Sequence, residues 1–281
     1  MAAVTDFRDL FSARAACYAR ARPGYPAALF DYLASVAPRR GLAWDCGTGN
    51  GQAAVGLAAH FERVIATDSS AAQIAHATPH PRVAYRVAPA ESADLEPKSV
   101  DLIAVAQALH WFDLDAFYAN VRRAAAPGCV IAAWCYTLPR VSPALDAVCA
   151  RFYRDVAGPY WAPQRRFIDE RYESIHFPFN ESEDQNRDRK RVGNSFACRA
   201  DWNLNQYFDY LSSWSAVQQY KTARGRDPVD EVRADLTAAW GAEEAPRSVT
   251  WPIHLRVGRI ESSAPKSVVA LPSRGENRGQ S

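Results

Sequence analysis

The chain has 281 residues, of which 48% are hydrophobic and 23% are charged, as is ordinary for a globular protein. Its 33 basic and 31 acidic residues leave a formal net charge of +2, which gives no support to a nucleic-acid partner. The longest apolar stretch, around Val100 to Trp111, is too short to span a bilayer, and the first residues lack a secretory signal pattern. We therefore expect a cytoplasmic protein with neither a nucleic-acid nor a membrane partner.

The six cysteines do not form a recognisable metal-binding pattern. None belongs to a CxxC pair, and no set of Cys and His residues has zinc spacing. Cys46, Cys129 and Cys135 lie in or beside apolar, strand-like runs. We therefore expect reduced thiols packed in the core and no metal site.

The first half of the chain alternates between predicted helices and strands. Helical spacing of apolar residues predicts two short helices, around Phe7–Arg14 and Leu29–Val36. Apolar, strand-like runs follow at Leu42–Cys46, Arg63–Thr67, Arg82–Val87, Val100–Ala106 and Cys129–Trp134, with helical segments at Gly51–Ala59, Ser70–Ala77 and Asp115–Ala125. This alternation predicts an α/β fold with a parallel sheet covered on both faces.

The second half has a different pattern, and we interpret residues 1–260 as one domain. We expect a helix at Val141–Val156, a strand at Tyr172–Phe179, helices at Asp201–Tyr220 and Val229–Trp240, and a last strand at Ser248–Ile260. The helices of residues 200–242 would form an insertion before the last strand. The polar run within residues 181–194 predicts a mobile loop, and residues 261–281 predict a disordered tail.

The predicted insertion is rich in large aromatic residues, and two interpretations are open for them. They could form a lid that excludes water from a site, or they could pack between the helices and the sheet. We favour packing. The residues concerned are Trp202, Tyr207, Tyr210, Trp214 and Tyr220.

The segment from Asp45 to Gly51 is the strongest functional signal in the sequence. Asp45 ends an apolar strand, and Gly47, Gly49 and Gly51 follow before the next helix. Glycines are needed where the chain turns sharply and where backbone approaches a ligand closely, and a nucleotide-like cofactor fits such a loop. The motif alone does not choose the cofactor, although nicotinamide enzymes prefer G-x-G-x-x-G and the third glycine is one residue early here.

Three further strand ends carry polar residues that would meet at the same edge of the sheet. Asp68 ends the second strand, where a carboxylate can accept both ribose hydroxyls, although it could instead cap the following helix. Glu91 follows the third strand, at a position that suits the adenine edge of a cofactor. The segment Gln107–Phe112 follows the fourth strand, beside the position where substrates of open α/β sheets bind.

These motifs at the strand ends, taken together, resemble those of the class I S-adenosylmethionine-dependent methyltransferases, and the resemblance covers residues 5–260. Finer features resemble the branch of the trans-aconitate methyltransferases, and they lie at Tyr18–Pro26, His110–Asp113, Trp214–Val217 and Thr222–Pro228. The resemblance implies a Rossmann-like, seven-stranded, mostly parallel sheet with an antiparallel last strand and helices inserted before it. It also implies S-adenosylmethionine as the cofactor.

The resemblance assigns cofactor contacts to particular residues. The methionyl part would lie against the glycine loop, the ribose against an acid, and the sulfonium beside a glutamine, while Tyr18 and Tyr25 would cover the cofactor. The implied cofactor-binding residues are Asp45, Gly47, Thr48, Gly49, Asp68, Ala90, Glu91, Gln107 and Tyr18.

The expected reaction is methyl transfer to a small-molecule acceptor. The resemblance to the trans-aconitate methyltransferase branch favours a carboxylate as that acceptor. A carboxylate is already ionised near neutral pH, so it needs cationic clamps and no general base. Candidate clamps are Arg22, Arg140, Arg224 and Arg226. His110 is the candidate catalytic residue, because it could orient an acceptor or act as a base.

Several alternatives stay open from the sequence. The acceptor could be another oxygen or nitrogen of a small molecule. The protein could also bind S-adenosylmethionine as a non-catalytic scaffold, or it could be a nicotinamide-dependent oxidoreductase. His110 and each arginine could equally have a purely structural role.

Overall fold

The computed structural model describes residues 22–181 and 196–261. The predicted helix Phe7–Arg14, the cofactor contact of Tyr18, most of the predicted loop at 181–194 and nearly all of the predicted tail lie outside the described residues.

A seven-stranded sheet forms the centre of the molecule, with the strand order β3-β2-β1-β4-β5-β7-β6. Strands β1 to β5 pair in parallel, and β7 runs antiparallel to both of its neighbours. The predicted fold class, with an antiparallel last strand, is therefore confirmed. The strands are β1 (Leu42–Cys46), β2 (Arg63–Asp68), β3 (Val83–Val87), β4 (Val100–Ala106), β5 (Ala125–Tyr136), β6 (Ala197–Trp202) and β7 (Arg247–Arg259).

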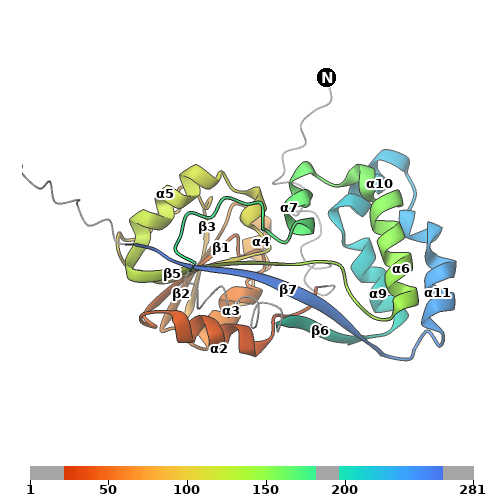
Figure 1. Ribbon diagram of the computed structural model, residues 1–281, viewed down its shortest axis with the longest axis horizontal. Helices are drawn as coiled ribbons and strands as arrows, with labels where there is room; N and C mark the ends of the chain where they lie inside the picture. Colours follow the sequence, from red (N-terminus) through yellow and green to blue (C-terminus); the bar gives the residue numbers. More distant parts are fainter. Residues whose placement is uncertain (1–21, 182–195, 262–281) are drawn as a thin grey trace, which may run out of the picture.

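Helices cover both faces of the sheet. Figure 1 shows α2 and α3 on one face and α5 on the opposite face. The described α-helices are α2 (Ala27–Val36), α3 (Gln52–Ala58), α4 (Ala71–Ala75), α5 (Leu114–Ala124), α6 (Pro143–Arg151), α7 (Arg166–Asp169), α9 (Leu204–Ser212), α10 (Ser215–Arg224) and α11 (Arg233–Trp240).

Alternate residues of each central strand enter two separate cores. In β4, Leu102 packs with the core under α2 and α3, while Ile103 packs with the core under α5. Ala43 and Trp44 of β1 divide in the same way. Because successive strand side chains point to opposite faces, strands that are apolar throughout must be buried on both sides. This is why the strands read as continuous apolar runs in the sequence.

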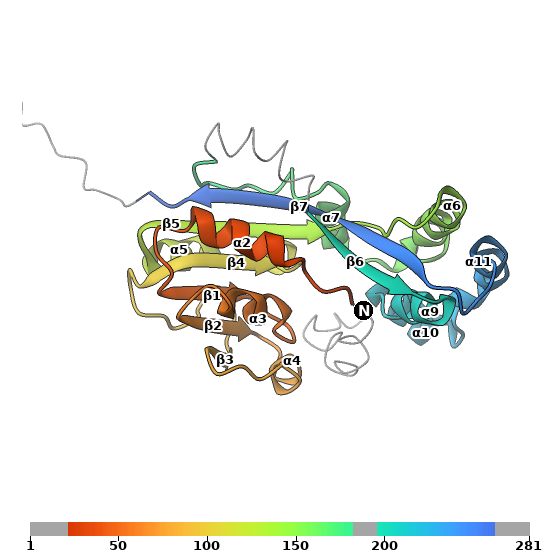
Figure 2. The same cartoon turned by 90° about the horizontal axis from the view of Figure 1, so that it is seen from below.

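The inserted helices lie beyond one end of the sheet. Figure 2 shows α6, α9, α10 and α11 gathered past the end toward which β5 points, with the long β7 reaching into them. The aromatic side chains of this region are at most 8% exposed, from Tyr207 at 0% to Trp202 at 8%. They pack against one another and against Trp251 of β7. This burial agrees with the packing interpretation, although Tyr210 and Trp214 also line a cavity.

The predicted strand Tyr172–Phe179 is wrong, and the sixth strand is Ala197–Trp202 instead. Tyr172 has a positive φ of 63°, and Nη1 of the buried Arg256 donates to the carbonyls of Tyr172 (3.0 Å) and Ile175 (2.7 Å). The backbone oxygens that a strand would offer to a neighbour are therefore bound by a side chain. The alternating apolar residues pack onto the sheet face instead.

The predicted helix Asp201–Tyr220 is also wrong in its limits. Asp201 and Trp202 belong to β6, and the helix begins after Asn203, which forms a capping box with Gln206. Such reciprocal caps satisfy the free N–H groups of a first helical turn. The region then divides into α9 and α10, which are separated by Ser213 and Trp214.

Burial of the described cysteines is as predicted. Cys46, Cys129, Cys135, Cys149 and Cys198 are all buried free thiols. Over residues 22–181 and 196–261, no group of three or more His, Cys, Asp or Glu side chains could hold a metal ion. Within the same ranges, no helix has both the length and the apolar character needed to cross a bilayer.

Candidate active site

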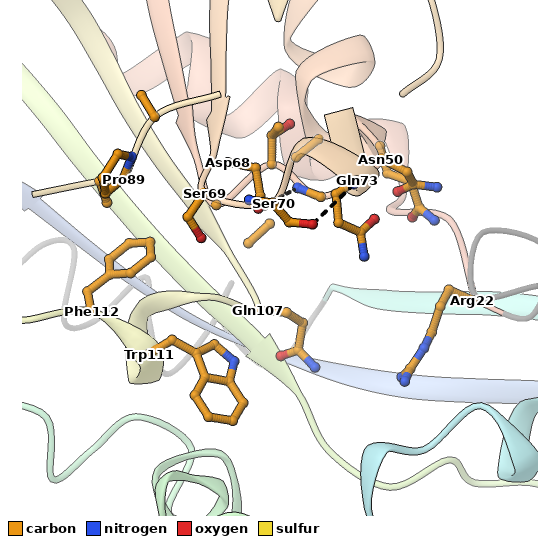
Figure 3. A pocket seen from close by; sticks show the side chains of 18 of the residues that line it. Arg22, Asn50, Asp68, Ser69, Ser70, Gln73, Pro89, Gln107, Trp111 and Phe112 are labelled. Carbon is orange, nitrogen blue, oxygen red and sulfur yellow. Dashed lines mark hydrogen bonds between the residues drawn. The ribbon is translucent and has the colours of Figure 1, made fainter. Parts of the chain in front are cut away.

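A cavity of about 350 Å³ lies at the carboxyl ends of the parallel strands. This volume falls in the range of sites for small molecules and cofactors. In Figure 3, Asp68, Ser70 and Gln73 lie along one side of the cavity, Gln107 and Trp111 lie along another, and Arg22 approaches from a third. The cavity is therefore built from the loops after β1, β2, β3 and β4, as in other open α/β sheets.

The three glycines of the loop after β1 all have positive φ angles, but they are needed for two different reasons. A β-carbon on Gly47 would lie 2.5 Å from Cβ of Ala108, and one on Gly51 would lie 2.2 Å from the hydroxyl of Tyr85. A β-carbon on Gly49 would meet nothing closer than Oε1 of Gln73, at 3.9 Å. Gly47 and Gly51 thus permit packing within the protein, whereas Gly49 leaves open space on the cavity side.

Asp45 lies beneath this loop and is completely buried. Its Oδ2 accepts a hydrogen bond from the hydroxyl of Thr48 at 2.6 Å, while its Oδ1 has no hydrogen-bond partner among the described residues. Burial raises the pKa of the Asp45 carboxyl from 3.8 to about 7, against the opposing effects of hydrogen bonds from the hydroxyl of Thr48 and from the backbone N–H of Ala54. A buried acceptor of this kind favours a ligand that brings a donor or a positive charge.

Asp68 both lines the cavity and braces the glycine loop. One carboxylate oxygen accepts from the backbone N–H of Gly49 at 2.9 Å, and the other accepts from that of Ser70 at 2.8 Å. Burial raises the pKa of Asp68, and these two hydrogen bonds oppose the rise. Ser70, rather than Asp68, caps α4. The carboxylate keeps further lone pairs for a ligand, because it can accept about four hydrogen bonds.

The loop after β3 closes another side of the cavity. The Oε1 atom of Glu91 accepts from the backbone N–H of Asp113 at 3.0 Å, and the carbonyl of Ala90 accepts from the side chain of Asn120 at 3.0 Å. These two bonds join the loop to the segment that follows β4. Ala90 and Glu91 both line the cavity. The next element after Glu91 is the strand β4, so Glu91 does not lie in the first turn of a helix.

Gln107 follows directly after β4 and has a left-handed backbone conformation, with φ of 56°. Its Oε1 accepts from the backbone N–H of Tyr136 at 2.9 Å, and its own N–H donates to the carbonyl of Trp134 at 2.8 Å. Such a conformation is costly for a residue other than glycine and is found mostly where a site requires it. Here it places the side chain between the large cavity and a smaller neighbouring one.

The smaller cavity, of about 60 Å³, separates the end of the sheet from the inserted helices. It shares Arg22, Gln107, Trp111 and Tyr136 with the large cavity. The segment between β5 and β6 adds Trp161, and the inserted helices add Tyr210 and Trp214. The two cavities are therefore adjacent parts of one site.

His110 lines the smaller cavity but is 93% buried, since its exposed fraction is 7%. Its Nδ1 lies 2.8 Å from the hydroxyl of Tyr172. Burial, assisted by the charge of Arg165, lowers the pKa of His110 to about 3. The imidazole is therefore neutral near pH 7, so it can form hydrogen bonds there but adds no positive charge.

One of the four predicted arginines lines the site. Arg22 borders both cavities and donates from Nη1 to the hydroxyl of Tyr136 at 3.2 Å. Arg140 is exposed, and its backbone pairs with that of Thr250. Arg224 donates a hydrogen bond to the hydroxyl of Tyr160. Arg226 forms an ion pair with Glu231. None of these three lines either cavity among the described residues.

The structure brings most of the predicted cofactor residues together. Gly47, Thr48, Gly49, Asp68, Ala90, Glu91 and Gln107 line the large cavity, and Asp45 lies buried beneath its loop. Gln73 and Arg165 are two of the lining residues that the sequence analysis did not assign to the site. Gln73 is 4% exposed and its Oε1 has no partner among the described residues, and Arg165 lines the smaller cavity. The first could have been found from its place one turn into the helix after Asp68, whereas the second has no signal in the sequence.

An S-adenosylmethionine head group fits these residues on chemical grounds. Oε1 of Gln73 at the cavity wall and Oδ1 of Asp45 beneath the glycine loop are both buried acceptors without partners in the described part of the chain. Gln73 is among the described lining residues and Asp45 is not, and Gly49 leaves open space beside Gln73. An ammonium group supplies the donors that such acceptors need. A phosphate would instead need donors, which these two oxygens cannot provide.

Comparisons with known proteins agree with this geometry. Residues 44–133 match the family model described as a methyltransferase domain. A protein of Dictyostelium discoideum that is named a methyltransferase is 32% identical over 264 residues, which cover 92% of this chain and 97% of that protein. A Saccharomyces cerevisiae protein that is named for S-adenosylmethionine-dependent methyl transfer is 25% identical, over 70% of this chain and 77% of that protein.

A solved structure shows the same fold. It is that of a protein from Anaeromyxobacter dehalogenans described as a type II methyltransferase, with 47% identity and a TM-score of 0.77, over 85% of this chain and 98% of that one. The sheet order, the glycine loop with its two acids and the near-complete match to named methyltransferases agree with one another. The chain therefore belongs to the class I S-adenosylmethionine-dependent methyltransferases.

Proposed function

We propose that the protein methylates a carboxylate of a small acid, which binds where the smaller cavity meets the cofactor cavity. The observation that carries the proposal is the charge of the smaller cavity. Its described lining includes the guanidinium groups of Arg22 and Arg165 and no Asp or Glu side chain. A pocket with two arginines and no acid favours an anionic ligand, because arginine binds carboxylates through charge-assisted hydrogen bonds.

The cofactor would occupy the large cavity, and the bound cofactor supplies an electrophilic methyl group. Asp45 and Gln73 would accept hydrogen bonds from its amino-acid end, and Asp68 would accept from its ribose. Gln107 would lie at the junction with the acceptor. Arg22, which lines both cavities, would hold the acceptor carboxylate at that junction and so fix its approach.

The protonation state of His110 supports a carboxylate over an amine or a hydroxyl. An amine or hydroxyl acceptor must lose a proton, and a base is most effective when its pKa is near the working pH. His110 has a pKa of about 3, so it is a poor base at neutral pH. A carboxylate is already ionised, and we propose that His110 orients it through a hydrogen bond.

The entry segment supports membership of the trans-aconitate methyltransferase-like branch. Pro23 and Tyr25 of the segment that resembles that branch line the large cavity beside Arg22. The ring of Tyr25 packs edge-on against Trp134 at 5.5 Å. We therefore include trans-aconitate among the acids to be tested.

Transfer of a radiolabelled methyl group to a panel of small acids tests this function. We expect base-labile label, because mild alkali releases the methyl group of an ester. Arg22→Gln should raise KM for the acid by about 10- to 100-fold through the loss of a charge-assisted contact. Arg233→Gln is the control, since Arg233 is half-exposed and pairs with Asp230 at 3.2 Å.

Two results would contradict the proposal. Label that survives alkali would indicate an ether or an N-methyl product. Cofactor binding without transfer to any acid of the panel would instead favour a scaffold role.

A further inference from the structure

The side chain of Arg165 reaches the smaller cavity from the segment between β5 and β6. Its Nε–H donates to the hydroxyl of Tyr153 at 2.8 Å. Its guanidinium carbon lies 4.6 Å from the ring centroid of Trp161 and 5.2 Å from that of Tyr153. The side chain is only 20% exposed. A planar guanidinium held by an aromatic ring and a hydrogen bond is fixed in orientation before any ligand arrives.

The anchoring contacts leave the terminal nitrogens of Arg165 available to a ligand. Within the described residues, the hydrogen bond of this side chain is made by Nε. Oδ1 of Asp169 lies 3.8 Å from the same Nε and accepts from the hydroxyl of Tyr153 at 2.6 Å. The acid thus sits on the Nε side of the group. Nη1 and Nη2 remain as a pair of donors of the kind that matches a carboxylate.

Asp169 forms an ion pair with Arg165 from the Nε side, at 3.8 Å, but this acid lies outside the described lining of the cavity. No Asp or Glu side chain is among its described lining residues. His110, beside it, is neutral and so adds neither a second cation nor an anion. A cation in a largely buried site gains most from a ligand of opposite charge.

The size and place of the cavity limit what can bind there. Its volume of about 60 Å³ holds one short arm of a molecule rather than a whole acceptor. It opens to the large cavity at Arg22 and Gln107, where the acceptor carboxylate would react. Trp161 and Trp214, with ring centroids 5.6 Å apart, form its wall.

We propose that Arg165 determines specificity by binding a short anionic arm of the acceptor, away from the oxygen that is methylated. This inference rests on the proposed function, because it needs an acceptor that reacts at the junction of the two cavities. It adds that the preferred acceptor carries a second anionic group.

The test compares three acids of similar length. Glutarate carries a carboxylate at each end, pentanoate carries one, and 4-phosphonobutanoate carries a carboxylate and a phosphonate. Kinetics would be measured for the wild type, Arg165→Met and Arg165→Lys. Arg233→Met is the matched control, because Arg233 also pairs with an acid and also stacks on a ring, that of Phe208 at 4.4 Å. Calorimetry with protein loaded with S-adenosylhomocysteine would give binding of the same acids without turnover.

We expect the wild type to prefer a diacid to pentanoate, and the preference between glutarate and 4-phosphonobutanoate would show whether the arm is a carboxylate or a phosphate-like group. Arg165→Met should reduce the preference for the diacid by about 10- to 100-fold. The change should lie in KM and in the calorimetric Kd for the diacids, because the arm contact is the same in ground and transition states. The preference of Arg165→Lys for the diacid should lie between those of the wild type and Arg165→Met, and the preference of Arg233→Met should match that of the wild type.

Different outcomes would overturn the two proposals. The role of Arg165 would be overturned if the wild type had equal kcat/KM for pentanoate and the diacids, or if both Arg165 variants kept the wild-type preference for diacids. Formation of methyl ester in the same experiments would still support the proposed function. Unaltered binding of S-adenosylhomocysteine would show that the variants are folded. Absence of ester from every acid, with no binding by calorimetry, would overturn both.

Discussion

The carboxyl group of Asp45 is held in an environment that disfavours its charge. It is fully buried, and its pKa rises to about 7 mainly because of that burial. Since the folded pKa lies above the usual value of 3.8, the unbound protein loses stability as pH rises from about 4 to about 7. A bound cationic head group would reverse the preference and favour the ionised form.

Binding of S-adenosylhomocysteine should therefore weaken as pH falls below about 7. If the cofactor pairs with the ionised carboxylate, its apparent Kd should rise by up to about tenfold per pH unit between pH 7 and pH 5. In Asp45→Asn, Kd should be higher at pH 8, and its dependence on pH should be shallower. Calorimetry across this range measures both, and a wild-type Kd that is constant from pH 5 to pH 8 would show that Asp45 does not pair with the cofactor.

Substitutions at Gly49 and Gly225 can distinguish a steric clash with the cofactor from the strain of a left-handed backbone. Both have positive φ, 56° and 69°, and a β-carbon on Gly225 would have no atom within 4 Å. Gly49→Val and Gly225→Val should each lose about 1–2 kcal/mol of stability from the left-handed conformation. Gly49→Val should also weaken S-adenosylhomocysteine binding by at least about 10- to 100-fold, because overpacking costs about 1–3 kcal/mol.

The measurement is a Kd and an unfolding curve for each variant. Gly225→Val, at the end of α10, should bind the cofactor as the wild type does. Wild-type affinity in Gly49→Val would mean that the cofactor does not approach this backbone.

Residues of the cofactor half of the site could be predicted because they follow directly after strands. Asp45, Gly49 and Asp68 each stand where an apolar run ends, and parallel strands bring their carboxyl ends to one edge. The acceptor half could not be predicted in this way. Arg165 lies on a short 3₁₀ turn, Pro163–Arg165, far along the chain from Arg22, and only the folding of the inserted region brings the two to one cavity.

At the scale of elements, the first five strands were predictable and the sixth was not. β1 and β4 are buried on both faces along almost their whole length, so composition alone marks them, whereas β3 is largely exposed at the edge of the sheet opposite β6. β6 lies at the edge of the sheet, paired to β7 on one side, and its sequence Ala197–Trp202 mixes charged and apolar residues. Tyr172–Phe179 has the better strand pattern, but the hydrogen bonds from Arg256 hold its first carbonyls in another conformation.

The aromatic cluster joins the inserted helices to the sheet, and Trp251 is its point of attachment on β7. Trp251 is fully buried, and its ring centroid lies 4.8 Å from that of Trp202 and 5.3 Å from that of Tyr210. Trp251→Ala should lower the free energy of unfolding by about 3–5 kcal/mol, because it removes a large buried side chain and leaves a cavity.

Urea denaturation followed by circular dichroism measures this loss. Val87→Ala is the control, because Val87 is 55% exposed and should change stability by less than about 0.5 kcal/mol. A loss in Trp251→Ala as small as that of the control would mean that the cluster contributes little to holding the inserted helices.

At the scale of the whole molecule, the large cavity is lined by loops that follow four different strands, together with the segment before α2. The unfolded chain does not bring these loops together, so a ligand of this site binds the folded state alone. At a concentration of 100 times its Kd, such a ligand stabilises the fold by about 2.7 kcal/mol. For a chain of this size, that corresponds to a rise in Tm of about 5–10 °C.

S-adenosylhomocysteine should therefore raise Tm, and nicotinamide adenine dinucleotide should not. The reason lies in the polar groups around Gly49, which are the acceptor oxygens of Asp45, Asp68 and Gln73. They suit an ammonium group and hydroxyl donors but repel a pyrophosphate, which needs donors and positive charge. Thermal unfolding with each ligand, repeated in Gly49→Val, measures the difference. A shift with the dinucleotide, or a shift with S-adenosylhomocysteine that persists in Gly49→Val, would show that the ligand binds elsewhere than at the loop after β1.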